Sequence, residues 1–269
     1  MEQTWRWFGP EDPVSLENIV QAGASGVVTS LHHIPTGEAW PFEDLLARRQ
    51  EIEARGLRWS VVESIPVHND LKTRLGNYRQ ILDNYKTSIR NVGAAGVPVV
   101  CYNFMPVVDW TRTNLNYQLP NASQALRFEM TDFAAYDVYI LQRENAADDY
   151  QPQELEKARQ RLQAMTDEEQ ALLESNIIAG LPGGEGSYDR EGIRDAIAKF
   201  IELGPEGMRA NLYAFLEEVI PVAEQSGVRM CIHPDDPPFS LFGLPRVVST
   251  AADARSLLEA APSISNGLT

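Results

Sequence analysis

The sequence has few cysteines, no excess of positive charge and no long apolar run, and each shortage excludes a class of protein. Only Cys101 and Cys231 occur in 269 residues, which excludes a disulfide scaffold and favours a reducing compartment such as the cytoplasm. The net charge of −15 argues against a nucleic acid or an anionic membrane as partner, since both attract Lys and Arg. No apolar run approaches the roughly 20 residues of a membrane span, and no basic-then-apolar signal peptide opens the chain. We expect a cytoplasmic protein, and the composition is compatible with either a monomer or a homo-oligomer.

Short apolar runs alternate with helical patterns at the spacing of about 30 residues that a β/α unit has. The strand-like runs lie at 1–8, 26–33, 57–65, 97–104 and 228–233, and a further one begins near 265. Helical patterns cover 14–21, 41–55, 75–95, 188–203, 205–225 and 247–261. The runs are nearly continuous, which suits parallel strands covered on both faces. We therefore predict one α/β domain over 1–269, a (β/α)8 TIM barrel. An open doubly wound sheet competes, but no glycine-rich phosphate turn follows the first strand.

An insertion interrupts the repeat at about 105–187. It is expected to hold a hairpin around Pro120 and helices at 128–142, 153–165 and 167–178, the last with a capping box at Thr166–Glu169. A chain that stops at its sixth strand leaves sheet edges unpaired and cannot close a barrel. We therefore expect a partial barrel, truncated after about five strands.

A histidine and two carboxylates follow the apolar run that ends at Ile232. Pro234 stops the strand because proline cannot donate to the ladder, so His233, Asp235 and Asp236 lie at its C-terminal tip. Such a set could bind a divalent metal or move protons. The alternative is an Asx-Pro turn in which an aspartate caps the backbone.

Polar residues also end the other runs, and in a barrel these ends converge on the mouth that holds the active site. The candidate substrate-binding residues at these ends are His32, His33, Glu63, Tyr102 and Asn103. One of the two histidines is expected to face the core or a helix. Glu63 is costly to bury unpaired, so we expect it to bind substrate or a polar network, or to pair with an arginine.

Arg112 is a further candidate because arginine binds carboxylates through two parallel hydrogen bonds. With Asp109 and Trp110 it could form a lid or a carboxylate clamp over the mouth. The alternative is an ordinary surface loop.

Several long segments resemble the N-terminal two thirds of the mannonate dehydratase family. They include Gly26–Pro35 (GVVTSLHHIP), Val100–Thr113 (VCYNFMPVVDWTRT) and Gly227–Pro238 (GVRMCIHPDDPP). The resemblance implies a TIM-barrel lyase that dehydrates D-mannonate to 2-dehydro-3-deoxy-D-gluconate in hexuronate (glucuronate) catabolism, with Fe²⁺ or Mn²⁺ as its metal.

The resemblance also implies that His233 is a metal ligand. The family's cysteine, second histidine and aspartate ligands, and its catalytic acid/base residues, would follow Thr269, so the catalytic residues stay unknown in this chain. Asp235 and Asp236 could orient His233 as outer carboxylates. We expect the chain alone to be inactive. The alternatives are an inactive fragment or pseudogene product and a related metal-dependent sugar isomerase.

Overall fold

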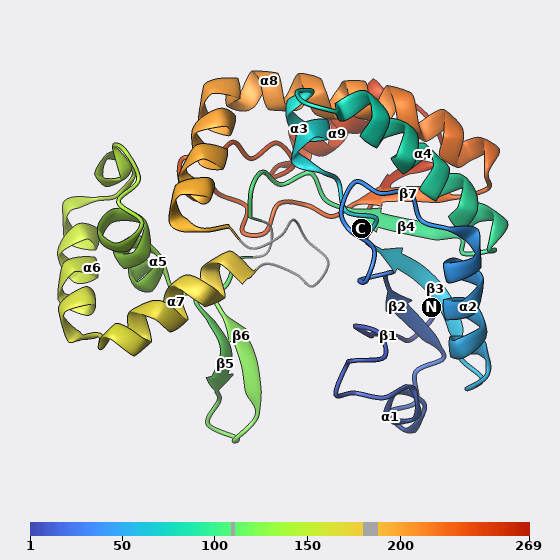
Figure 1. The fold of residues 1–269 in the computed structure, drawn as a ribbon, viewed down its shortest axis with the longest axis horizontal. Helices are drawn as coiled ribbons and strands as arrows, with labels where there is room; N and C mark the ends of the chain where they lie inside the picture. The colour runs from blue at the N-terminus through green and yellow to red at the C-terminus, as the bar shows by residue number, and fades with distance from the viewer. Residues whose placement is uncertain (109–110, 180–187) are drawn as a thin grey trace.

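A computed structural model describes residues 1–108, 111–179 and 188–269 of the chain. Its centre is a six-stranded sheet in the order β1-β2-β3-β4-β7-β8, in which every neighbouring pair is parallel (Figure 1). The strands are β1 Thr4–Arg6, β2 Gly26–Thr29, β3 Arg58–Glu63, β4 Val99–Tyr102, β7 Arg229–Ile232 and β8 Asn266–Leu268. This confirms the predicted α/β fold with parallel strands.

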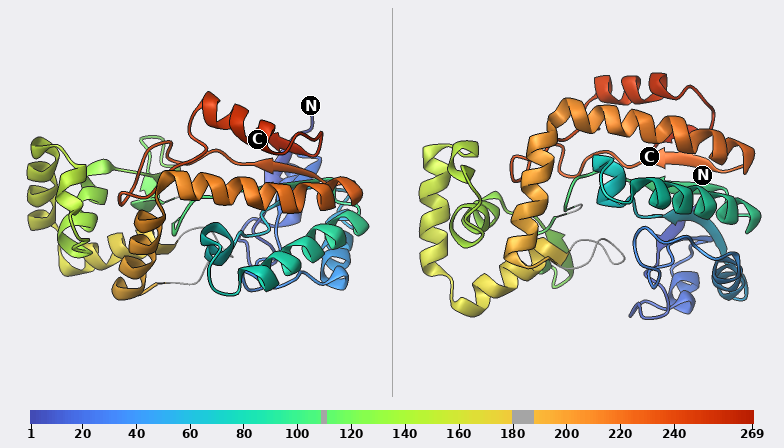
Figure 2. Two further views of the ribbon diagram at one scale, coloured as in Figure 1. Left: turned by 90° about the horizontal axis from the view of Figure 1, so that it is seen from above. Right: turned by 45° about the horizontal axis from the view of Figure 1, so that its top comes forward.

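Helices connect consecutive strands and cover one face of the sheet. They are α1 Leu16–Gln21, α2 Phe42–Glu53, α3 Asn69–Thr73, α4 Tyr78–Ala94, α8 Arg190–Gln225 and α9 Ala251–Ala260. Helices α4, α8 and α9 lie side by side (Figure 2). Helix α8 bends at Gly204, whose φ of +67° is non-helical, so it corresponds to the two helices predicted on either side of this point.

The two faces of the sheet differ in chemistry because successive strand residues point to opposite sides. One row across β3, β4 and β7 is formed by Val62, Val100 and Met230, all buried in the core. The next row is formed by Glu63, Cys101 and Cys231. Both cysteines are free thiols, as expected for a chain without a disulfide scaffold. The second row carries polar groups toward the carboxyl end of the sheet.

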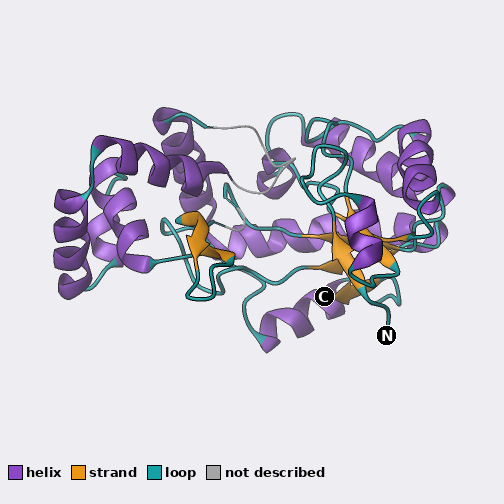
Figure 3. Cartoon of the chain, turned by 90° about the horizontal axis from the view of Figure 1, so that it is seen from below, coloured by secondary structure: helices purple, strands orange, loops and turns teal. Residues whose placement is uncertain are grey.

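The insertion folds into a hairpin and a group of helices beside the main sheet. The hairpin pairs β5 Asn114–Gln118 with β6 Gln124–Arg127 in antiparallel fashion, and it lies apart from the six-stranded sheet (Figure 3). The helices are α5 Met130–Ala135, a π-helical turn at Tyr136–Ile140, a 3-10 turn at Ala146–Asp149, α6 Pro152–Ala164 and α7 Asp167–Ala179. The predicted capping box is present, since Thr166 Oγ1 accepts from the Glu169 N–H and Glu169 accepts from the Thr166 N–H.

A buried ion pair holds the insertion helices together. Arg143 Nε and Nη2 donate to the two carboxylate oxygens of Asp137 at 2.9 and 2.8 Å, and the Tyr150 hydroxyl donates to Asp137 Oδ2 at 2.9 Å. Asp137 is fully buried. Across the described residues, no helix is long and apolar enough to cross a membrane.

Candidate active site

The carboxyl ends of β3, β4 and β7 enclose a small pocket. Its lining is Glu63, Ser64, Cys101, Tyr102, Asn103, Met105 and His233. The volume is about 10 Å³, which is close to the least that a water molecule needs. Parallel strands therefore bring four of the candidate residues together from three distant parts of the sequence, as the barrel prediction requires.

His233 follows β7 directly and is held by the backbone on two sides. Its N–H donates to the Tyr102 carbonyl at 2.7 Å, and its ring Nδ1 lies 2.7 Å from the Pro234 carbonyl oxygen. A carbonyl oxygen only accepts, so Nδ1 carries a proton, and a neutral His233 has its lone pair on Nε2. This is the tautomer that a histidine metal ligand needs, with its second nitrogen fixed by a backbone oxygen.

Asp235 has the turn-capping role rather than that of a partner to His233. Its Oδ2 accepts from the Val248 N–H at 2.7 Å and from the Ser249 hydroxyl at 2.8 Å. Its own N–H donates to the Val248 carbonyl at 3.0 Å. These three bonds tie the loop after β7 to the segment that enters α9.

Asp236 pairs with the insertion. Arg112 Nη2 lies 2.9 Å from Asp236 Oδ2, and Arg112 Nη1 donates to the Thr111 carbonyl at 3.0 Å. The carboxylate that Arg112 binds is therefore one of the protein's own. Asp109 and Trp110, which were expected to accompany Arg112, lie outside the described residues.

Glu63 forms an ion pair with Arg6, the alternative role considered from the sequence. Arg6 Nη1 lies 2.6 Å from Glu63 Oε2, and each side chain is 23% exposed. Arg6 ends β1 and was not among the candidate residues. The sequence signal that could have found it is its place at the last residue of a strand, where the other candidates also lie.

The adjacent histidines His32 and His33 face different surroundings. His33 Nε2 lies 3.0 Å from Asp44 Oδ2 on α2, and the His33 side chain is 56% exposed. His32 turns inward beside Arg6 and Arg48. Burial, and then the positive charges of these two arginines, lower the pKa of His32 to about 4. His32 is therefore neutral near pH 7.

Tyr102 lies on the pocket wall, but its ring packs on the helix side of the sheet. The ring centroid is 5.9 Å from that of Phe215 on α8, and burial raises the pKa of the Tyr102 hydroxyl. Tyr102 was expected to bind substrate hydroxyls, and its position differs from that expectation. Strand alternation turns its ring away from the face that carries Cys101. Asn103 lies in the pocket, where its Oδ1 accepts from the Met105 N–H at 3.4 Å.

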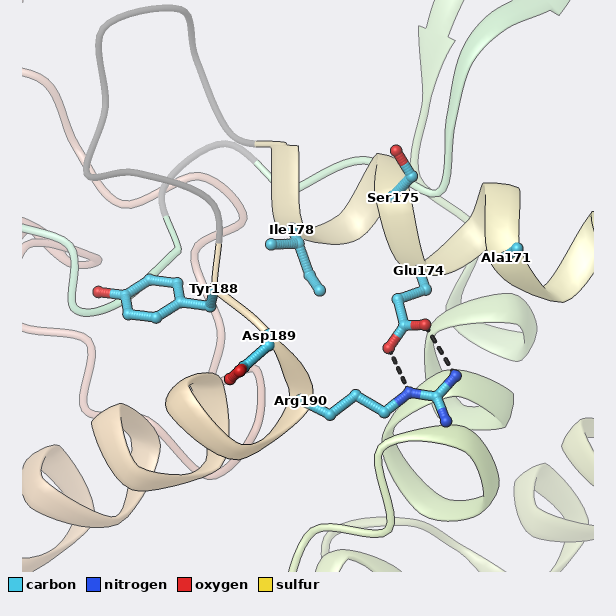
Figure 4. Close-up of a pocket in the computed structure, with 7 residues that line it drawn as sticks. All are labelled: Ala171, Glu174, Ser175, Ile178, Tyr188, Asp189 and Arg190. Atoms are coloured by element: carbon cyan, nitrogen blue, oxygen red, sulfur yellow. Dashed lines mark hydrogen bonds and ion pairs between the residues drawn. The ribbon is translucent and has the colours of Figure 1, made fainter.

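A larger cavity of about 590 Å³ lies between α7 and the start of α8 (Figure 4). Its charged groups bind each other, since Arg190 donates through Nε and Nη2 to both oxygens of Glu174 at 2.6 and 2.8 Å. Tyr188 accepts from Asn69 Nδ2 at 2.9 Å. These contacts join the insertion to α8 and α3, away from the strand ends.

The metal-ligand expectation concerns His233. In the described ranges, which omit 109–110 and 180–187, no group of three or more His, Cys, Asp or Glu side chains could hold a metal ion. His233 fits a single ligand position, because the Pro234 carbonyl fixes its Nδ1 and imidazole is a common ligand of iron and other divalent transition ions.

The comparisons with known proteins agree with this arrangement. A family model described as D-mannonate dehydratase (UxuA) matches residues 1–269. The chain belongs to the D-mannonate dehydratase family. It is 67% identical to the mannonate dehydratase of Saccharophagus degradans over 269 residues and 56% identical to mannonate dehydratase 2 of Agrobacterium fabrum. Each alignment covers 100% of this chain and 68% of the relative.

A solved structure has the same fold. The mannonate dehydratase of Streptococcus suis serotype 2 aligns with a TM-score of 0.72 at 36% identity, over 100% of this chain and 63% of that protein. The resemblance inferred from the sequence segments is therefore confirmed at the level of the D-mannonate dehydratase family. The chain spans about two thirds of the length of these relatives.

Proposed function

We propose that this chain carries part of the active site of a metal-dependent dehydratase that converts D-mannonate to 2-dehydro-3-deoxy-D-gluconate in hexuronate (glucuronate) catabolism. The observation that carries the proposal is the position of His233 in the pocket at the strand ends, with its Nδ1 bonded to the backbone. Membership of the D-mannonate dehydratase family supports the substrate. The six parallel strands are proposed to be consecutive strands of a (β/α)8 barrel, and β1 and β8 are the edge strands of the six-stranded sheet.

The reaction removes a weakly acidic proton from C2 and a hydroxyl from C3. A bound Fe²⁺ or Mn²⁺ would act as a Lewis acid on an oxygen of the substrate. His233 would hold this ion through Nε2. Glu63, oriented by Arg6, and Asn103 line the same pocket and would bind substrate hydroxyls there. We also predict a cytoplasmic location for this protein, and a homo-oligomeric state is compatible with this function.

Mn²⁺ binding to the chain tests the role of His233 without requiring turnover. We expect His233→Ala to weaken Mn²⁺ binding by at least about tenfold, which is 1.4 kcal/mol, in a calorimetric titration. His33→Ala is the matched control, because His33 pairs with α2 outside the pocket. Equal Mn²⁺ affinity in the wild type and the His233→Ala variant would contradict the proposed ligand.

Turnover is tested separately with D-mannonate and with aldoses, in the presence of Mn²⁺ or Fe²⁺. We expect the full-length S. degradans relative to dehydrate D-mannonate and leave aldoses unchanged, whereas isomerisation of an aldose would favour a sugar isomerase. The inactivity of this chain by itself stays a prediction, and formation of 2-dehydro-3-deoxy-D-gluconate by residues 1–269 would refute it.

A further inference from the structure

A group of buried nitrogen atoms, from the segments that follow β1 and β2 and from α2, has no hydrogen-bond partner among the described residues. These atoms are Arg6 Nε, Trp7 Nε1, both ring nitrogens of His32 and Arg48 Nη1. Trp7 is only 3% exposed and Arg48 only 9%. Burying an N–H group without a partner costs free energy, so such groups in a native protein point to a ligand, an ion or a bound water.

The side chains that carry these atoms form one cluster. The Arg48 guanidinium carbon is 5.1 Å from the centroid of the Trp7 ring, and that of Arg6 is 5.1 Å from the Phe8 ring. The rings of Phe8 and His32 are 6.0 Å apart. Two aromatic residues that follow β1 thus pack against the two guanidinium groups near the imidazole.

The backbone of Gly9 packs closely against this cluster. A Cβ atom on Gly9 would lie 2.9 Å from Arg48 Nη1 and 3.7 Å from His32 Nδ1. The φ of Gly9 is +94°, a conformation that L side chains rarely adopt. Nitrogen atoms of Arg48 and His32 therefore converge beside the Gly9 backbone, at a point that only glycine permits.

Two guanidinium groups lie at this point, and each has a nitrogen atom without a partner. The two arginines already bind carboxylates, but through other nitrogens: Arg6 Nη1 binds Glu63 at 2.6 Å, and Arg48 Nε binds Glu51 at 3.2 Å. Asp12 is a further carboxylate near His32, and it accepts from two backbone N–H groups at 2.7 and 2.9 Å. Burial is the largest cause of the lowered pKa of His32; the charges of Arg6 and Arg48 lower it further, and the charge of Asp12 opposes them.

We propose that Arg6, His32 and Arg48 form an oxyanion pocket that binds the carboxylate of the sugar-acid substrate. This inference rests on the proposed function for its ligand. The Arg6–Glu63 ion pair joins the oxyanion pocket to the strand-end pocket that contains His233. The substrate therefore lies with its carboxylate at the β1–β2 side of the mouth and its hydroxyl-bearing carbons toward Glu63 and His233.

The test uses residues 1–269 without added metal and follows the ¹⁵N signals of the His32 ring by NMR, assigned with His32→Gln. D-mannonate is expected to shift these signals with saturation. D-mannitol, which has the same number of carbons and no carboxylate, is expected to leave them unchanged. Equal shifts with D-mannitol, or equal affinity for inorganic phosphate and D-mannonate, would overturn the assignment of a sugar-acid carboxylate. An unchanged ring signal with saturating D-mannonate would mean that these nitrogens contact water only, and would also overturn it.

Variants of α2 test the role of Arg48. Arg48→Met is expected to weaken D-mannonate binding at least tenfold, and Arg48→Lys to weaken it less, because lysine keeps the charge but loses the planar fork. Arg49→Met is the matched control, since Arg49 binds Glu53 and the Ala95 carbonyl instead. Far-UV circular dichroism shows whether each variant folds. If Arg48→Met fails to fold, Arg48→Lys decides, and an unchanged affinity in that variant would contradict the proposal.

These outcomes separate the oxyanion pocket from the proposed function because the NMR titration contains no metal and requires no turnover. Saturable D-mannonate binding at His32 without dehydration by the full-length relative would leave the pocket standing and reject the reaction. Dehydration by the relative with no response of His32 in this chain would support the reaction and reject the oxyanion pocket.

Discussion

Replacing Asp235 with alanine is expected to loosen the loop that carries His233. Asp235 is 6% exposed, and its Oδ2 accepts from the Val248 N–H and the Ser249 hydroxyl. Alanine would remove both bonds and leave the buried Val248 N–H without an acceptor. The Ser249 hydroxyl can rotate to another partner, but a backbone N–H cannot.

The magnitude follows from the type of each bond. A hydrogen bond to a charged group contributes about 1.5–3 kcal/mol, and an unsatisfied buried donor costs about 1–3 kcal/mol, so we expect Asp235→Ala to destabilise by about 3 kcal/mol. In Asp235→Asn one amide oxygen can take the place of Oδ2 and accept from both donors. Only the charge is lost, and the expected cost is about 1 kcal/mol.

Asp236→Ala is the matched control at the neighbouring position. Asp236 is 33% exposed and pairs with Arg112, and an ion pair of this kind contributes about 0–1 kcal/mol. Thermal unfolding followed by circular dichroism checks the order. At about 2–4 °C per kcal/mol for a large domain, Asp235→Ala should lower Tm by about 6–12 °C. A decrease no larger than that of Asp236→Ala would refute the reasoning.

Three further predictions concern other ion pairs and histidines. The pKa of His32 is lowered by burial and by nearby guanidinium groups from 6.5 to about 4. The folded state therefore binds this proton less tightly than the unfolded state, so the free energy of unfolding is highest above pH 6.5 and falls as the pH decreases toward 4. His32→Gln should reduce this fall between pH 7 and pH 5, as measured by urea unfolding. Asp137→Ala should cost about 3–5 kcal/mol because it leaves Arg143 buried without its main partner, whereas Glu156→Ala on an exposed pair should cost at most about 1 kcal/mol; equal urea midpoints would contradict this difference. His33→Ala should destabilise by less than about 1 kcal/mol, and a larger decrease in Tm would mean that its pair with α2 is not a surface contact.

The spacing of apolar runs predicted the parallel sheet, since each run is a buried strand and each helical pattern a crossover. Strand ends were less well predicted. The run at 26–33 becomes a strand only over Gly26–Thr29, because its pairing with β3 ends at Thr29. Helix α3 was missed, since its five residues are too few to show a helical period.

The sequence also predicted which residues end the strands, but not which neighbours they meet. Arg6 and Glu63 lie far apart in the chain, and they pair because β1 and β3 flank β2 in the sheet. The resemblance to a known family identified His233, yet only the fold shows that its Nδ1 is bonded to the Pro234 carbonyl.

The sequence by itself determined the order of strands and helices, the polar character of the strand ends and the family. These properties follow from local apolar periodicity and from the segments that resemble a known family, both of which can be read along a single chain. The tertiary structure alone decided that His32 turns toward two arginines while His33 turns toward α2. The physical reason is that strand alternation no longer sets side-chain direction beyond the last ladder residue, so charges and rings from distant segments select it.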